Sequence, residues 1–177
     1  MTVLKILHVP DPRLKITAQP VEKVDASIAR LMEDMLETMY VKQGVGLAAT
    51  QVGVNQRVIV VDGSETDKPE PLKLANPELL WRSQESKDVS EGCLSVPEQY
   101  AEVNRFTRVK FRYLDEHNQT VEREAGGLLA HVIQHEIDHL EGKVFVEYLS
   151  QLKQSRIQTK LKKQQRLTKP SVLSMSV

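Results

Sequence analysis

The sequence contains one cysteine, few aromatic residues and no long apolar run. Aromatic residues make up 5% of the 177 residues, and Cys93 is the only thiol. A single cysteine excludes an internal disulfide and is typical of a protein kept in a reducing cytoplasm. No apolar run approaches the roughly 20 residues of a membrane-spanning helix, and residues 1–10 are too weakly apolar for a signal peptide. We therefore expect a cytoplasmic protein with no membrane segment.

Acidic residues are absent after Glu147, although the chain as a whole is formally neutral. The basic residues beyond that point are Lys153, Arg156, Lys160, Lys162, Lys163, Arg166 and Lys169. The preceding part of the chain carries a net charge of about −7, from 17 basic and 24 acidic side chains. A basic segment on an acidic body is typical of docking to a polyanion, but a solvated helix face would look the same.

The length suits one domain with a sizeable core, and we place that domain at residues 1–165 with a flexible tail at 166–177. Asp25 resembles a helix N-cap, and Gly44 is expected to end the helix in a left-handed conformation. The helix is predicted to bury one apolar stripe, formed by Ile28, Met32, Met35 and Met39.

Several strands are predicted in the middle of the chain from β-branched runs and from alternating apolar and polar residues. The expected strands are 57–61, 72–74, 79–81, 106–114, 120–124 and 144–149. Cys93 is interpreted as lying in a glycine-flanked loop within the stretch of residues 88–97. Ser150 is expected to cap a final helix that packs through Leu152, Ile157 and Leu161.

The stretch His135-Glu136-Ile137-Asp138-His139 reads H-E-x-x-H within a helical pattern at residues 127–140. Residues i and i+4 lie on one face of a helix, so two imidazoles can share one divalent metal ion. The glutamate between them can then act on a water molecule at that metal, as in metalloproteases with this motif. An ordinary polar helix face is the alternative.

A catalytic metal site of this kind needs a third protein ligand. His131 lies eight residues before His139, about 12 Å along a helix, which is too far for one ion. We therefore expect His131 to line the cavity beside the metal. Cys93 is the stronger candidate, because Cys-His-His is a known catalytic ligand set. A buried, inert cysteine is the alternative. His8 and His117 have no partner pattern and are expected at the surface or at caps.

Three stretches together resemble the signature motifs of peptide deformylases, in the order of that family. They are Gly44–Gln51 (GVGLAATQ), Glu91–Ser95 (EGCLS) and Gln134–His139 (QHEIDH). The resemblance implies an α+β fold with antiparallel sheets packed around a central metal-binding helix, an N-terminal helix and a basic C-terminal helix. It implies hydrolysis of the N-formyl group of the N-terminal formylmethionine of new polypeptides, with release of formate.

The resemblance also implies ligands, catalytic groups and partners. Cys93, His135 and His139 would hold ferrous iron, and Zn²⁺, Ni²⁺ or Co²⁺ could occupy the same site. Glu136 would activate water and carry the proton, while the Gln51 amide and the Leu94 N–H would stabilise the oxyanion. The expected substrate-binding residues are Val45, Gly46, Glu91, Gly92, Leu128, His131 and Val132. Formylmethionyl nascent peptides are the expected partners, with ribosomal RNA a further one for the basic helix.

Two rival functions fit parts of the pattern. A zinc endopeptidase shares the H-E-x-x-H helix but normally takes its third ligand from histidine or glutamate, and it would not need Cys93 or the glycine-rich stretch. A metal-bearing module that binds formylated N-termini without turnover would lack part of the catalytic set, and no part is missing here.

Overall fold

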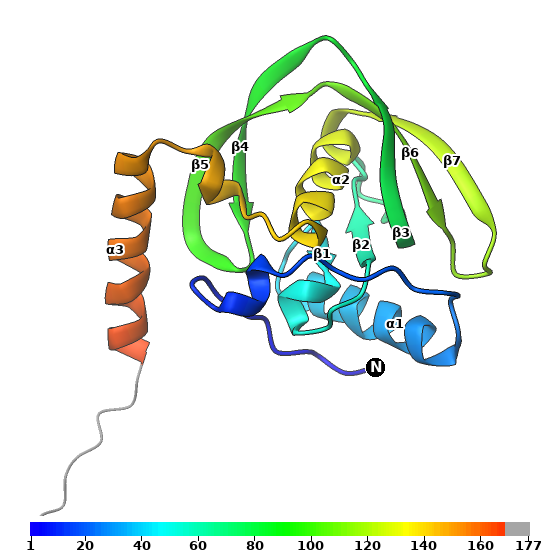
Figure 1. Cartoon of the computed structure of the whole chain (residues 1–177), viewed down its shortest axis with the longest axis horizontal. Helices are drawn as coiled ribbons and strands as arrows, with labels where there is room; N and C mark the ends of the chain where they lie inside the picture. The colour runs from blue at the N-terminus through cyan, green and yellow to red at the C-terminus, as the bar shows by residue number, and fades with distance from the viewer. Residues whose placement is uncertain (169–177) are drawn as a thin grey trace, which may run out of the picture.

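Three α-helices and two antiparallel β-sheets make up residues 1–168, the part of the chain that this computed structural model describes. The helices are α1 (Ala26–Val41), α2 (Gly127–Leu140) and α3 (Gln151–Thr168). The larger sheet has the order β1 (Gly46–Ala48), β2 (Val58–Asp62), β3 (Pro71–Arg82), β6 (Arg108–Leu114) and β7 (Thr120–Gly126). The second sheet pairs β4 (Ser86–Cys93) with β5 (Val96–Phe106). Helix α2 lies between the two sheets, which confirms the predicted α+β class (Figure 1).

Helix α1 begins and packs as its sequence predicts. The Asp25 carboxylate accepts a hydrogen bond from the Ile28 N–H at 2.9 Å and so caps the first turn. All four residues of the predicted apolar stripe are buried, including Met32 and Met35 at 0% exposure. The prediction for its end is wrong, because the helix stops at Val41 and Gln43, not Gly44, has a positive φ of 57°.

Strand β2 holds the two main core clusters together. Val58 and Val60 face α1, while Ile59 and Val61 face α2. All four side chains are at 0% exposure. Burying a side chain of this size stabilises the fold by about 1.5–3 kcal/mol. The strand is therefore apolar at consecutive positions, and it fixes α2 against the sheet.

Strand β3 is continuous, although two short strands at 72–74 and 79–81 are predicted. The chain passes Asn76 with a positive φ of 48°, and the register against β6 shifts between Ala75 and Glu78. The Asn76 side chain holds this bulge to the N-terminal segment through the Val21 N–H and carbonyl, both at 2.8 Å. Asn76 and Pro77 therefore form a β-bulge within one strand and do not divide β3 into two strands.

The β4–β5 hairpin contains Cys93, for which a loop is predicted, and that prediction is wrong because Cys93 ends a strand. A tight turn at Leu94 and Ser95 joins the two strands, so Cys93 is the last residue of β4. Val96 and Val103 on β5 pack into a third core cluster with α3. The hairpin is therefore a rigid platform for Cys93.

The segment after α2 contains a 3-10 helix, η3 (Phe145–Tyr148), where a strand at 144–149 is predicted. The Glu147 carboxylate accepts a hydrogen bond from the Val144 N–H at 2.7 Å and stabilises this turn. Phe145 is 1% exposed and anchors the segment in the core. The Glu147 cap and the buried Phe145 ring therefore favour a 3-10 helix over the strand that the β-branched residues predict.

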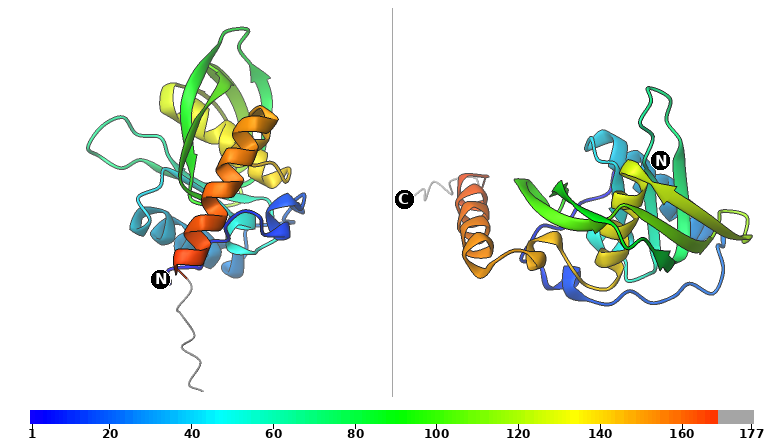
Figure 2. Two further views of the ribbon diagram at one scale, coloured as in Figure 1. Left: turned by 90° about the vertical axis from the view of Figure 1, so that its left-hand side faces the viewer. Right: turned by 90° about the horizontal axis from the view of Figure 1, so that it is seen from above.

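Helix α3 lies along the outside of the β4–β5 sheet (Figure 2). Ile157 and Leu161 are buried as predicted, whereas Leu152 is 62% exposed, contrary to the prediction. The helix runs to Thr168, so the domain boundary predicted after residue 165 falls inside it. Residues 169–177 of the predicted tail lie outside the described part. No helix among residues 1–168 combines the length and apolar character of a membrane span.

Candidate active site

Helix α2 and the end of β4 bring three potential metal ligands together. The Cys93 Sγ lies 3.2 Å from the His139 Nε2, which lies 3.2 Å from the His135 Nε2. The three donor atoms all lie within 4.8 Å of one another. Ligands held tetrahedrally on one ion at about 2.1 Å are separated by about 3.4 Å. The spacing and the chemistry of this donor set therefore fit one divalent cation.

The His135 ring is oriented by Glu91 on β4. The His135 Nδ1 donates to the Glu91 carboxylate at 2.8 Å, which leaves Nε2 directed at the other two donors. Burial lowers the pKa of His135, but its hydrogen bonds with Cys93 and Glu91 outweigh burial and raise that pKa well above its usual value. Burial is the main reason that the pKa of His139 lies well below its usual value, and the charge of His135 lowers it further. The two imidazoles therefore lie in different electrostatic surroundings, with an acidic partner only at His135 among residues 1–168.

Arg105 on β5 ties this arrangement to helix α2. Its Nε and Nη2 both contact the Glu91 carboxylate, the latter at 3.0 Å, and its Nη1 lies 2.7 Å from the Asp138 Oδ2. The Arg105 and Glu91 side chains are only 5% and 7% exposed. Burial raises the pKa of Glu91, but hydrogen bonds from His135 and Arg105 outweigh it and lower that pKa to about 2. Glu91 is therefore a carboxylate at neutral pH.

Glu136 faces the cavity from the turn between the two histidines. It is 3% exposed, and its Oε2 has no hydrogen-bond partner within residues 1–168. Burial is the main reason that the pKa of Glu136 is raised to about 7. A Cβ on Gly46 would lie 2.4 Å from the Glu136 Oε1 and 2.8 Å from a Val132 methyl group. Only glycine leaves room for this carboxylate beside β1.

Gln51 and Leu94 lie next to the cysteine. The Gln51 Oε1 accepts from the Ala48 N–H at 2.8 Å, which directs Nε2 towards the Cys93 Sγ at 3.4 Å and the Ser95 Oγ at 3.1 Å. The Leu94 N–H, in the hairpin turn, donates to no acceptor in the described part of the chain. Two N–H donors are thus present beside the candidate metal site.

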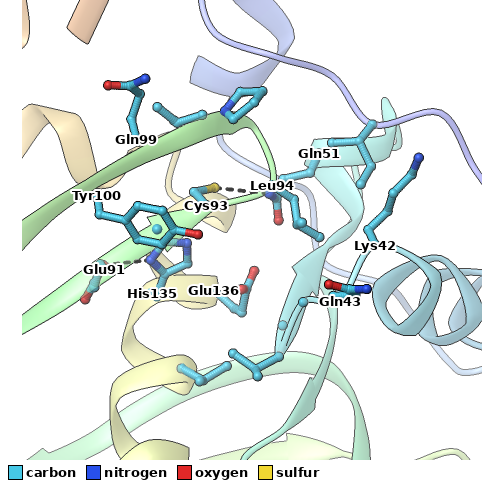
Figure 3. A pocket seen from close by; sticks show the side chains of 18 of the residues that line it. Lys42, Gln43, Gln51, Glu91, Cys93, Leu94, Gln99, Tyr100, His135 and Glu136 are labelled. Carbon is cyan, nitrogen blue, oxygen red and sulfur yellow. Dashed lines mark hydrogen bonds and ion pairs between the residues drawn. The ribbon is translucent and has the colours of Figure 1, made fainter.

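A cavity of about 810 Å³ opens onto these groups. Figure 3 shows Cys93, His135 and Glu136 between Tyr100 on one side and Lys42 and Gln43 on the other. The predicted substrate-binding residues all line it, namely Val45, Gly46, Glu91, Gly92, Leu128, His131 and Val132. The Glu91 carboxylate itself is occupied by His135 and Arg105.

Two predicted surface histidines have different surroundings. His117 is exposed, in the turn between β6 and β7. His8 is also exposed but lines the outer part of the cavity, which the sequence does not indicate. His131 is 8% exposed and lies in the cavity wall, apart from the cluster of three donors.

Sequence reasoning misses Arg105, Tyr148 and Ser95. Arg105 bridges two acidic residues, and the Tyr148 hydroxyl donates to the Asp138 Oδ2 at 2.9 Å while its ring packs beneath the guanidinium. The one available signal is Asp138, a carboxylate inside a mostly apolar helix that needs a cationic partner. Nothing local identifies Arg105 as that partner.

Comparisons with known proteins show one family. Residues 3–155 match the family model of polypeptide deformylase. The chain is 42% identical to the peptide deformylase of Ehrlichia chaffeensis, with a TM-score of 0.91 over 94% of this chain and 98% of that one. It is 45% identical to a peptide deformylase of Legionella pneumophila, with a TM-score of 0.89 over 96% of this chain and 100% of that one. The chain therefore belongs to the polypeptide deformylase family, hydrolases that remove the N-formyl group from newly made polypeptides.

Proposed function

We propose that this chain removes the formyl group of N-terminal formylmethionine with a metal ion held by Cys93, His135 and His139. As a family member it is a metal-dependent deformylase. The observation that carries the assignment is the convergence of one sulfur and two imidazole nitrogens within 4.8 Å beside a buried carboxylate. When bound, a divalent metal lowers the pKa of water and polarises the formyl carbonyl.

Glu136 moves the proton in this reaction. Amide hydrolysis needs a base that takes a proton from water and an acid that returns it to the leaving nitrogen. The Glu136 Oε2 has no partner within residues 1–168, and burial raises its pKa to about 7. A carboxyl group with a pKa near the working pH can both accept and return that proton.

Gln51 and Leu94 stabilise the negative charge that develops on the formyl oxygen. The Gln51 Oε1 is held by the Ala48 N–H, which keeps the side-chain NH2 directed at the candidate metal site, where it donates to the Cys93 Sγ and the Ser95 Oγ. To stabilise the oxyanion, the N–H group that donates to Cys93 turns to the formyl oxygen. The Leu94 N–H projects from the hairpin turn next to Cys93. Loss of one donor of this type costs about 3–4 kcal/mol of transition-state stabilisation.

The methionine side chain occupies the inner part of the cavity. Leu128, Val132 and Val45 supply apolar walls, and His131 supplies a polar one. Gly46 and Gly92 lack Cβ atoms, so the substrate backbone can approach β1 and β4 closely. A Cβ on Gly92 would lie 2.5 Å from the ring of the exposed Tyr100, so a side chain at position 92 would displace that ring.

One assay separates this function from its rivals. Metal-loaded protein is incubated with formyl-Met peptides, and formate and free amine are measured. Release of both supports deformylation, whereas internal peptide fragments would indicate an endopeptidase. Tight binding without product would indicate a recognition module and would refute the proposal.

We propose ferrous iron as the metal in the cell, with Zn²⁺, Ni²⁺ or Co²⁺ able to replace it. A thiolate with two neutral imidazoles is a ligand set that several of these ions accept. Iron held by a thiolate is sensitive to oxygen, so an anaerobic iron preparation should be more active than an aerated one. Equal activity after aeration would favour zinc or nickel.

We also propose that α3 docks on ribosomal RNA. The helix is fixed to the body by Ile157 and Leu161, while its basic residues Lys153, Arg156, Lys160, Lys162, Lys163 and Arg166 are all exposed. No carboxylate within residues 1–168 forms an ion pair with any of these six. Polycationic faces of this kind bind phosphates and release counterions. We propose a cytoplasmic location, since nascent chains and ribosomes are found there.

Co-sedimentation with ribosomes tests this docking. Replacement of Lys153, Arg156 and Lys160 by glutamine should abolish co-sedimentation, and binding of the unaltered chain should weaken steeply with salt. Glutamine at Arg108, Lys110 and Arg112 on β6 changes the net charge equally and should have little effect. Binding that survives the changes in α3 would refute the docking proposal without touching the deformylase assignment.

A further inference from the structure

The outer part of the active-site cavity is lined by two lysines without acidic partners. Lys5, in the N-terminal segment, and Lys42, at the end of α1, both line the cavity and are exposed. Within residues 1–168 neither amino group lies in an ion pair. His8 lines the same part of the cavity. Partial burial, and then the charges of Lys42 and Lys5, lower the pKa of His8 below its usual value, so a positive charge on His8 is disfavoured there.

The carboxylates around this region compensate at most one of the two lysines. Glu91 is paired with Arg105, and Asp11 is paired with Arg13 at 2.7 Å. Glu98, which also lines the cavity, accepts a hydrogen bond from the neutral Gln164 side chain of α3 at 2.8 Å and keeps its single negative charge. Figure 3 shows Lys42 with Gln43 on one side of the cavity and the uncharged Gln99 and Tyr100 on the other. The outer cavity thus has a positive excess, and a cleft concentrates such a field.

Burial along the cavity shows which part of a substrate reaches this region. The lining is buried at His135, Glu136 and Val132 and exposed at Lys5 and Lys42. When formylmethionine lies at the inner end, the residues that follow it in the substrate chain must therefore pass through the outer part of the cavity. A cavity of about 810 Å³ is also larger than one methionyl residue needs, so it accommodates the residues that follow.

We propose that Lys5 and Lys42 make this deformylase prefer formylmethionyl chains with an acidic residue at the second or third position. The inference rests on the proposed function, since it assumes that formylmethionine binds at the inner end. Each lysine can pair with a substrate carboxylate at the solvent-exposed rim. Exposed ion pairs are weak and salt-sensitive, so the preference is modest.

The test compares substrates that differ only in charge. The peptides formyl-Met-Xaa-Ala-amide and formyl-Met-Ala-Xaa-amide carry Glu, Gln or Lys at Xaa, and the C-terminal amide removes the terminal carboxylate. With metal-loaded protein at low salt, we expect kcat/KM for Glu to exceed that for Lys by about two- to tenfold at one or both positions, mainly through KM. The ratio should approach one at 0.5 M salt because the Debye length falls to about 4 Å.

Variants of Lys5 and Lys42 test whether these two lysines cause the preference for acidic substrates. In the double variant Lys5→Gln/Lys42→Gln, the ratio of Glu to Lys peptides should fall close to one. Lys143→Gln, which alters a lysine outside this cavity, should keep the unaltered ratio. A ratio of two kcat/KM values from one preparation is independent of metal content and of the folded fraction.

Two results would overturn the inference. A ratio near one in the unaltered protein would show that the lysines do not select substrates. A ratio that persists in the double variant would place the selectivity elsewhere. In both events the neutral Gln peptides would still be deformylated. Absence of formate from every peptide would instead refute the proposed function, and this inference with it.

Discussion

Replacing Arg105 by methionine should destabilise the protein far more than replacing an exposed arginine. The Arg105 guanidinium contacts both Glu91 oxygens and lies 2.7 Å from the Asp138 Oδ2, and its side chain is 5% exposed. Methionine keeps much of the apolar stem but leaves Glu91 buried beside a second acidic residue. Removing one partner of a buried ion pair typically costs about 3–5 kcal/mol.

The pKa of Glu91 gives a second estimate of that cost. Its folded-state pKa of about 2 lies well below the ordinary glutamate value of 4.5. A difference of this size corresponds to about 3 kcal/mol of folding stability at neutral pH, part of it from His135. A lowered carboxyl pKa stabilises the fold above the unfolded pKa, and this contribution is lost as the pH falls through 4.5 towards 2. The cost of the Arg105 substitution should therefore shrink between pH 5 and pH 3, a range of about two units.

Urea unfolding of zinc-loaded protein measures both effects. The free energy of unfolding is compared for the unaltered chain and Arg105→Met at pH 7.5 and at about pH 4. Arg108→Met is the matched control, because Arg108 pairs with Glu124 where the two side chains are 62% and 59% exposed. The control should lose no more than about 1 kcal/mol. Equal losses for the two variants, or a loss for Arg105→Met that does not depend on pH, would refute the reasoning.

Three further predictions follow from the site and from α3. Glu136→Gln should retain metal by elemental analysis but lose at least about 10²-fold in kcat, and retained turnover would remove Glu136 from proton transfer. Gly46→Ala should reduce kcat/KM sharply, because its Cβ would meet Glu136, while Gly126→Ala, outside the cavity and with room for a Cβ, should not; equal activities would contradict this close approach. Leu161→Ala should destabilise the protein by about 2–5 kcal/mol in urea unfolding, since Leu161 is 5% exposed, and a loss below about 1 kcal/mol would show that α3 is not anchored there.

The parts of the fold that depend on neighbouring residues can be predicted from the sequence. The α1 stripe and the H-E-x-x-H helix follow from a 3.6-residue period, and an N-cap marks the start of α1. Gly142, with a φ of 76°, follows the end of α2, where glycine commonly ends a helix in the left-handed conformation. In each of these the interacting residues lie within one or two turns of each other.

The β4–β5 hairpin could not be predicted in the same way. Val89 and Val103 face one another across the hairpin, but most other pairs along β4 contain charged or small residues that reach solvent. The strand pattern is weak because only part of one face is buried. Cys93 therefore looks like a loop residue when the sequence alone is considered.

Long-range polar contacts are also invisible in the sequence. Arg105 and Asp138 are separated by 33 residues, and Glu91 and His135 by 44. Charged residues on strands are ordinary at a surface, so no local feature indicates that Arg105 is buried. The resemblance to a family supplies Cys93 as a ligand, but the structure is needed to see which groups hold Glu91 and His135 in place.

X-ray absorption at the zinc edge of the zinc-loaded protein tests the proposed metal site most directly. The proposed ligands predict one sulfur at about 2.3 Å and two imidazole nitrogens at about 2.0–2.1 Å, with any remaining neighbour an oxygen. Cys93→Ser should remove the sulfur signal, while His131→Ala should leave the spectrum unchanged. A spectrum without sulfur, or with three imidazoles, would contradict the proposed site.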